Sequence, residues 1–241
     1  MNLEDKVSVI IPSFERFEYL KNAIESVENQ SYQNFEIIVI NDGSKDERYY
    51  KNTFNDKVKF LHLETNQSSI NSFGPGKVRN FGIEIATGKY IAFLDDDDIW
   101  LEHKLSIQLE QMNYYKTNFS CSEAFYGNGA FDKNTKYQKY NKEVFFKTIK
   151  QKYKNSGYFK NNDSFPRFWS YNFLKIHNCI ITSSVVVEKK LLNHLNGFRG
   201  LPYSADYDCW LGLLQHTDCL YIDEPLTYYD GSHGYGQNYF K

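Results

Sequence analysis

Short apolar runs alternate with helix-like apolar spacing along the first hundred residues of the chain. Continuous aliphatic and β-branched runs predict strands over residues 7–11, 35–40, 58–63 and 90–94. Apolar side chains recur at helical spacing over residues 18–29 and 77–86. Strands that are apolar throughout and alternate with helices indicate a parallel sheet covered by helices on both faces. Right-handed crossovers bring the carboxyl ends of such strands to one edge, where these sheets bind ligands.

The pattern changes in the second half of the chain. Residues 121–178 are rich in Lys, Asn, Tyr and Phe, have weak periodicity and contain one helical stretch near residues 143–153. Regular patterns return with a predicted strand over residues 180–187, helices over 189–195 and 206–214, and short strands over 219–222 and 226–229. We interpret His177, Trp169 and Trp210 as packing residues.

The composition fits one globular domain of 241 residues with 41% hydrophobic residues. A formal net charge of −2 gives no reason to expect a nucleic-acid partner or an anionic membrane surface. No apolar run approaches the roughly 20 residues of a membrane span, and the first residues do not resemble a secretion signal. We therefore expect a cytoplasmic protein without a transmembrane segment. The four cysteines form no C-x-x-C pair, so we expect reduced core residues.

Four consecutive aspartates at residues 95–98 directly follow the predicted strand at residues 90–94. Adjacent carboxylates repel one another, and a divalent cation among them relieves that repulsion. Such a cation could bridge a carboxylate to the oxygens of a diphosphate. The alternative is a solvated acidic turn that caps the following helix. The apolar strand before the run and Ile99 and Trp100 after it favour the cation site.

Four segments, at residues 7–13, 41–44, 78–83 and 93–98, together resemble family 2 glycosyltransferases in order and spacing. The resemblance covers about the first 115 residues and returns more loosely between residues 180 and 229. It implies an inverting enzyme with the α/β GT-A fold. In that fold, a Rossmann-like nucleotide-binding half with a mostly parallel central sheet (residues 1–115) joins an acceptor-binding half (residues 116–241) in a single domain.

The resemblance also implies roles for individual residues. The nucleotide-sugar-binding set comprises Pro12, Ser13, Phe14, Glu15, Asp42, Gly76, Arg79, Asn80, Asp95 and Asp96. Within it, Asp42 is expected to contact the base or ribose, and Asp96 the ribose. Asp97 is the expected main ligand of a Mn²⁺ or Mg²⁺ ion, with Asp95 and His233 as further ligands. For His233, a surface position without a ligand role is an equal alternative. Asn41 departs from the family pattern, in which an acid is frequent.

A second acidic site lies at Asp206, at the start of a predicted helix. Its position resembles that of the family's catalytic base, which takes the proton of an acceptor hydroxyl as that oxygen attacks. The alternative reading is a helix N-cap, a position that Asp also favours. Asp208 is expected to be structural, and Thr182 and Ser183 to line the acceptor side. Ala205 and Gly212 depart from the family pattern, which has Glu and frequently Arg there.

These observations predict a metal-dependent transferase that moves a sugar from a nucleoside diphosphate sugar, UDP-linked in the first instance, to a hydroxyl of a glycan or other acceptor. The processive synthase pattern Gln-x-x-Arg-Trp is absent from the sequence, which favours transfer of a single residue. Two alternatives stay open: an inactive sugar-nucleotide-binding protein and a nucleotidyltransferase. The segment Gly74 to Lys77 lacks the glycine spacing of a phosphate-binding loop, and we reject that interpretation.

Overall fold

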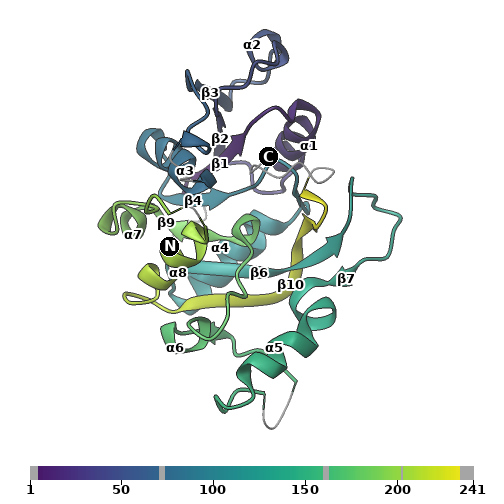
Figure 1. The fold of residues 1–241 in the computed structure, drawn as a ribbon, viewed down its shortest axis with the longest axis vertical. Helices are drawn as coiled ribbons and strands as arrows, with labels where there is room; N and C mark the ends of the chain where they lie inside the picture. Colours follow the sequence, from purple (N-terminus) through teal and green to yellow (C-terminus); the bar gives the residue numbers. More distant parts are fainter. Residues whose placement is uncertain (1–4, 71–73, 160–162, 202, 234–241) are drawn as a thin grey trace.

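A computed structural model describes residues 5–70, 74–159, 163–201 and 203–233. One mixed sheet runs through this part of the chain in the order β3-β2-β1-β4-β9-β6-β10-β5, with β7 beside β6 and β8 beside β10 (Figure 1). The strands are β1 (Val7–Ser13), β2 (Phe35–Asn41), β3 (Val58–His62), β4 (Tyr90–Phe93), β5 (Ile99–Trp100), β6 (Phe119–Gly127), β7 (Gln138–Lys139), β8 (Phe168–Trp169), β9 (Val186–Glu188) and β10 (Cys219–Asp230).

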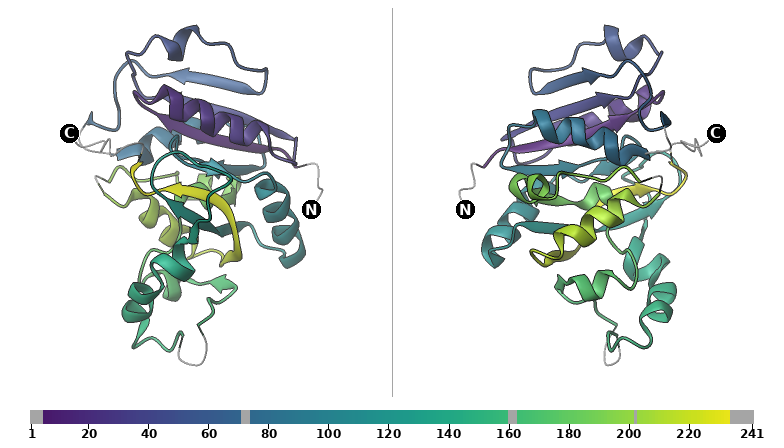
Figure 2. Two further views of the ribbon diagram at one scale, coloured as in Figure 1. Left: turned by 90° about the vertical axis from the view of Figure 1, so that its right-hand side faces the viewer. Right: turned by 60° about the vertical axis from the view of Figure 1, so that its left-hand side comes forward.

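Helices cover both faces of this sheet, as the sequence predicted. They are α1 (Phe17–Glu28), α2 (Arg48–Lys51), α3 (Gly74–Ile85), α4 (Lys104–Tyr115), the π-helix η2 (Tyr140–Val144), α5 (Phe146–Tyr153), α6 (Tyr171–Leu174), the 3₁₀ helix η3 (Thr182–Ser184), α7 (Lys189–His194) and α8 (Ala205–Leu213). Helix α1 lies on one face, with α3 and α8 on the other (Figure 1). The α5–α6 region extends beyond the β10 end of the sheet (Figure 2).

The first four strands of the path, β3-β2-β1-β4, are all parallel. Their apolar side chains alternate between two separate cores because successive residues of a strand point to opposite faces. In β1, Val7, Val9 and Ile11 pack with α1 and α4, whereas Ile10 packs with α3 and α8. Burial on both faces explains why the sequences of these strands are continuous apolar runs.

The sheet changes direction at β9, which runs antiparallel to both β4 and β6. Strand β10 then pairs parallel to β6 and antiparallel to β5 and β8. Strands β4 and β10 both end next to the four aspartates: β4 leads into them, and the last residue of β10, Asp230, donates its backbone N–H to Asp98. The two halves of the chain therefore meet at the acidic run.

Two predictions for the second half were wrong in detail. Residues 180–187 do not form one strand, because η3 interrupts them and only β9 remains extended. The hydroxyl of Ser184 donates to the carbonyl of Ile181 at 2.7 Å, a local bond that competes with strand pairing. The two short strands expected at 219–222 and 226–229 are one strand, β10, with register irregularities around Pro225.

Strand β6 was missed, because the sequence places polar residues at positions that the structure buries. Glu123 is fully buried in this strand and accepts hydrogen bonds from the backbone N–H groups of Asn141 and Lys142 and from the hydroxyl of Tyr221. Burial of Glu123 raises the pKa of its carboxyl group, while these donors oppose the shift. Glu123 accepts a fourth hydrogen bond from the backbone N–H of Ala124. Hydrophobic periodicity cannot predict a strand in which a charged residue is buried by such hydrogen bonds.

Of the three packing residues expected from the sequence, Trp169 and Trp210 lie in the core, whereas His177 is only half-buried. Trp169 and Trp210 are fully buried, and Trp169 stacks on Tyr221 with 4.3 Å between ring centroids. All four cysteines are buried free thiols, as predicted. None of the helices in the described part of the chain has the length and hydrophobicity needed to cross a bilayer.

Candidate functional site

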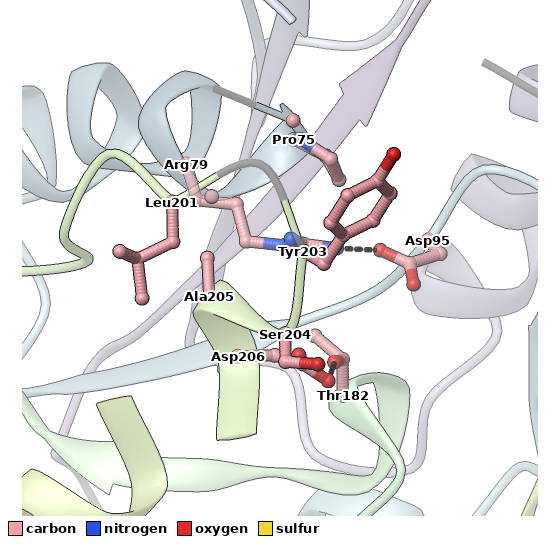
Figure 3. A pocket seen from close by; sticks show the side chains of 11 residues that line it. Pro75, Arg79, Asp95, Thr182, Leu201, Tyr203, Ser204, Ala205 and Asp206 are labelled. Carbon is pink, nitrogen blue, oxygen red and sulfur yellow. Dashed lines mark hydrogen bonds and ion pairs between the residues drawn. The ribbon is translucent and has the colours of Figure 1, made fainter. Parts of the chain in front are cut away.

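A cavity of about 250 Å³ opens at the sheet edge where the predicted ligand loops meet (Figure 3). Its walls come from the start of α3, the end of β4, η3 and the start of α8. The lining residues are Gly74, Pro75, Gly76, Arg79, Asp95, Thr182, Leu201, Tyr203, Ser204, Ala205 and Asp206. The fold thus brings one predicted donor-side pair, Arg79 and Asp95, to the same cavity as the predicted base, Asp206.

Arg79 and Asp95 form an ion pair at the wall of the cavity (Figure 3). Arg79 projects from α3 and is buried, with its guanidinium 5.8 Å from the ring centroid of Phe198. Asp95 retains about a third of its side-chain surface, 31%, open to solvent. A fixed guanidinium with a partly open carboxylate can bind the oxygens of a diphosphate and an accompanying cation.

Asp206 is the second residue of α8, so it is not the helix cap that we considered as an alternative. The N-cap is Ser204, whose backbone is left-handed (φ 56°) and whose side chain makes no capping bond. Asp206 is half-buried and accepts a hydrogen bond from the hydroxyl of Thr182 at 3.4 Å. Figure 3 shows the two side chains facing each other at the cavity floor.

Asp208 lies outside this cavity, in agreement with the structural role expected from the sequence. It accepts two hydrogen bonds from Arg199, one of them 2.7 Å from Nε. The chain therefore offers two aspartates on one helix, of which only Asp206 reaches the cavity.

The departures from the family pattern near α8 have a packing reason. Ala205 is buried against α3, and a Cβ atom added to Gly76 would lie only 2.8 Å from the Cβ of Ala205. The two small residues let α3 and α8 approach each other. A Cβ at Gly212 would lie 3.1 Å from the side chain of Leu195, so this glycine also lies at a close helix contact.

Asp96 and Asp97 are buried beside Arg16, which sequence analysis did not identify. Nη2 of Arg16 lies 2.6 Å from Oδ1 of Asp96, and Nη1 lies 2.9 Å from Oδ2 of Asp97. Burial raises the pKa of Asp96 to about 7 against the opposing effect of Arg16. Burial also raises the pKa of Asp97, and Arg16 again opposes the shift. One arginine thus compensates two desolvated carboxyl groups.

Asp98 joins the acidic run to the rest of the site through Ser183 of η3. The hydroxyl of Ser183 donates to Asp98 at 2.5 Å and accepts the backbone N–H of Asp95 at 3.0 Å. Burial, followed by the charges of Asp97 and Asp95, raises the pKa of Asp98 well above its usual range. Because Thr182 and Ser183 are consecutive, η3 contacts both Asp206 and the acidic run.

The segment expected to lie against the nucleoside comprises the end of β1, which is buried, and the first residues after it, which are more exposed. Pro12 and Ser13 are buried, and the hydroxyls of Ser13 and Tyr49 lie 2.6 Å apart. Phe14 is half-buried, and Glu15 is exposed with a left-handed backbone (φ 55°). Neither residue lines the cavity.

The side chains of Asp42 and Asn80 form hydrogen bonds within the protein. Asp42 is buried and accepts the backbone N–H groups of Gln67 at 2.6 Å and Ser68 at 3.0 Å. Asn80 exchanges two hydrogen bonds of 2.8 Å with the backbone of Phe198. Both side chains therefore order neighbouring loops, and their contacts with a nucleotide stay a prediction.

His233 lies near the acidic run, at the end of the described chain. Its side chain is exposed, its ring meets Tyr229 edge-on with 5.7 Å between centroids, and its carbonyl accepts a hydrogen bond from Arg16 at 3.1 Å. The turn therefore lies beside Asp97, because Nη1 of Arg16 donates both to this carbonyl and to Oδ2 of Asp97.

The acidic run offers hard oxygen donors that fit a divalent ion brought in with a phosphate ligand. Among the described residues, no group of three His, Cys, Asp or Glu side chains converges as a preformed cage. Mg²⁺ in nucleotide sites commonly takes one or two carboxylates and completes its shell with water and phosphate oxygens. Asp95 and Asp97 suit that role, since two arginines, Arg16 and Arg79, pair with the three acids Asp95, Asp96 and Asp97.

The sequence matches the model of the family described as Glycosyl transferase family 2 over residues 8–179. The Escherichia coli protein WfgD, named as a UDP-Glc:alpha-D-GlcNAc-diphosphoundecaprenol beta-1,3-glucosyltransferase, is 32% identical over 215 residues, which are 88% of this chain and 71% of WfgD. Uncharacterized Rickettsia glycosyltransferases also match, and the chain spans only 17% to 33% of the length of three of them.

Solved structures share the fold at low sequence identity. S. aureus TarS in complex with UDP-GlcNAc has a TM-score of 0.66 and 19% identity, over 97% of this chain and 61% of that one. The mannosyltransferase PcManGT from Pyrobaculum calidifontis, in complex with GDP-Man and Mn²⁺, has a TM-score of 0.63 and 14% identity, over 92% of this chain and 55% of that one. At these identities the likeness concerns the fold.

Proposed function

Because the chain belongs to glycosyl transferase family 2 and has the GT-A fold, we propose that it transfers a sugar from a UDP-linked donor to a hydroxyl of a glycan acceptor, with inversion at the anomeric carbon. WfgD, by its name, uses UDP-Glc, and TarS has been solved with UDP-GlcNAc, which supports a UDP donor. Because the chain spans a third or less of several relatives, the proposal concerns the chemistry of this domain.

The observation that carries the proposal is the shared cavity of Arg79, Asp95 and Asp206. The first two residues suit a donor diphosphate, and the third suits an acceptor hydroxyl. In the proposed reaction the acceptor oxygen attacks the anomeric carbon while the bond from that carbon to the diphosphate oxygen breaks. The hydroxyl proton passes to the carboxylate of Asp206. Arg79 orients the leaving diphosphate and stabilises the charge that develops on it.

A divalent ion held by Asp97, with Asp95 in support, would neutralise further charge on the diphosphate. Manganese is the first candidate because PcManGT has been solved with Mn²⁺. His233 is a third candidate ligand because it lies at the turn that shares Arg16 with Asp97.

The proposal is tested by calorimetry with UDP, GDP and dTDP, with and without Mn²⁺, followed by UDP release from UDP-sugars in the presence of glycan acceptors. We expect UDP binding that depends on the metal and that raises the melting temperature by ligand linkage. The Asp97→Asn variant should lose about 10- to 100-fold in metal-dependent UDP affinity. Folded protein that takes up none of the three nucleotides with Mn²⁺ or Mg²⁺ would contradict the proposal.

An inactive sugar-nucleotide-binding protein is the alternative that this experiment separates. Such a protein would bind UDP with the metal but release no UDP from any donor and acceptor pair. The packing of Ala205 and Gly212 explains their presence without loss of the base, so the structure favours the active enzyme.

A further inference from the structure

Arg16 holds a buried position that the proposed reaction does not use. Its side chain is only 4% exposed, and it contacts Asp96, Asp97 and the carbonyl of His233. These partners come from the loop after β4 and from the turn after β10, so one side chain joins three distant parts of the chain. The contact with Asp97 is a charge-assisted hydrogen bond, which is stronger than a neutral one, and the contact with Asp96 is an ion pair.

The carboxylate of Asp97, the proposed main metal ligand, is hydrogen-bonded to Arg16. Oδ2 of Asp97 lies 2.9 Å from Nη1, and the Asp97 side chain is only 8% exposed. A divalent ion on this carboxylate would be only a few ångströms from a fixed positive charge. Coulomb repulsion at such distances in a partly buried site is strong enough to weaken metal binding at least tenfold, by an estimate on the order of 332/(εr) with ε about 20.

We propose that Arg16 is the resident counter-cation of the acidic run, which the metal and nucleotide together displace from Asp97. This inference rests on the function proposed above and adds an order of binding to it. The metal alone binds weakly because Arg16 competes for Asp97. A nucleoside diphosphate strengthens metal uptake because its negative oxygens give the guanidinium of Arg16 a new partner when Asp97 leaves Arg16 to bind the metal ion.

The test is a Mn²⁺ titration of wild-type protein and the Arg16→Gln variant, with free Mn²⁺ followed by electron paramagnetic resonance. Without nucleotide, Arg16→Gln should bind Mn²⁺ roughly tenfold more tightly than wild type, in line with the Coulomb estimate. With saturating UDP the wild type should gain far more Mn²⁺ affinity than the variant gains. Equal or weaker Mn²⁺ binding by folded Arg16→Gln protein would overturn the proposal.

Two further variants separate this effect from a general loss of charge. Arg16→Lys keeps the charge but not the two-nitrogen contact, and its Mn²⁺ affinity should lie between those of the other two proteins. Arg199→Gln removes another arginine–aspartate pair, on Asp208 outside the cavity, and should leave Mn²⁺ affinity unchanged. An equal gain in Arg199→Gln would also overturn the proposal.

If Arg16→Gln does not fold, nitrogen NMR of the wild-type guanidinium decides the question. Addition of Mg²⁺ with UDP should shift the Nη signals of Arg16, whereas Mg²⁺ alone at the same concentration should shift them much less. Unchanged signals on a protein that binds Mg²⁺ and UDP would mean that Arg16 is not displaced from Asp97, and would leave the proposed function intact. A wild type that binds no nucleotide with either metal would instead contradict the function itself.

Discussion

The two acidic parts of the site are held in opposite ways. The run from Asp95 to Asp98 is fixed by buried ion pairs to Arg16 and Arg79 and by the hydroxyl of Ser183. Asp206, in contrast, is half-buried at the start of α8 and accepts a long, 3.4 Å hydrogen bond from the hydroxyl of Thr182. Asp96 and Asp98 are buried among these partners, and only Asp95 of the run lines the cavity, whereas Asp206 is open to the cavity.

This difference matches the two tasks of a sugar transferase. A diphosphate and its metal need oxygen donors and charges already in place, because preorganised charges in a dry site lose little energy to reorganisation during the reaction. A general base must instead be reached by the acceptor hydroxyl, so extensive protein hydrogen bonding to it would be unfavourable. The contrast therefore supports the roles proposed above, with donor binding at the acidic run and proton transfer at Asp206.

Substitution of the open acid gives the largest expected effect. Asp206→Asn keeps the shape of the side chain but removes the proton acceptor, so the rate of sugar transfer should fall by about 10²- to 10⁴-fold. Metal-dependent UDP affinity should change little, because the carboxylate does not contact the acidic run in this structure. Steady-state UDP release and calorimetry on the same preparation check both statements.

Asp208→Asn on the same helix is the matched control. Asp208 is ion-paired to Arg199 and lies outside the cavity, so the variant should keep nearly the full transfer rate. Full activity in Asp206→Asn, or equal losses in the two variants, would mean that the open acid is not the base.

The features that could be predicted from the sequence are those encoded by local patterns. The parallel strands of the first half were predicted because both faces of each strand are apolar, as the alternation of Ile10 and Val9 between two cores shows. The acidic run could be placed at the ligand edge because it directly follows a strand, whereas Arg79 and Asp206 were assigned from the resemblance to family 2 glycosyltransferases. Their convergence on one cavity follows from the connectivity of the sheet.

The remaining parts depend on contacts between distant residues that no local pattern encodes. Arg16 meets Asp97 across 81 residues, and Ser183 meets Asp98 across 85. Arg16 was visible only as a lone basic residue in the loop after the first strand. Strand β6 was missed because Glu123 is buried there, and its partners Asn141 and Tyr221 lie in other elements.

Removal of the Ser183 hydroxyl should loosen the rigid acids by an intermediate amount. In Ser183→Ala the buried Asp98 loses a donor and the N–H of Asp95 loses its acceptor. We expect a loss of about 1–3 kcal/mol in unfolding free energy and a several-fold loss of metal-dependent UDP affinity. Denaturant unfolding and calorimetry measure the two effects.

Ser184→Ala controls for the loss of a buried hydroxyl from the same helix. Ser184 is equally buried, but its hydroxyl donates to the carbonyl of Ile181 instead of the acidic run. It should lower stability without lowering UDP affinity. If both variants weaken UDP binding equally, η3 acts only as a structural support.

The smallest effect is expected from loss of the hydrogen bond that Asp206 accepts from Thr182. Thr182→Val removes the hydroxyl that donates to Asp206 while keeping the side-chain shape. A hydrogen bond of this kind contributes about 0.5–1.5 kcal/mol, so the transfer rate should fall by roughly 2- to 12-fold with the donor KM unchanged. Thr182→Ser keeps a hydroxyl at the same position and should recover most of the rate. If Thr182→Ser is as slow as Thr182→Val, the loss comes from packing in η3, and Asp206 then depends on the helix α8 alone for its position.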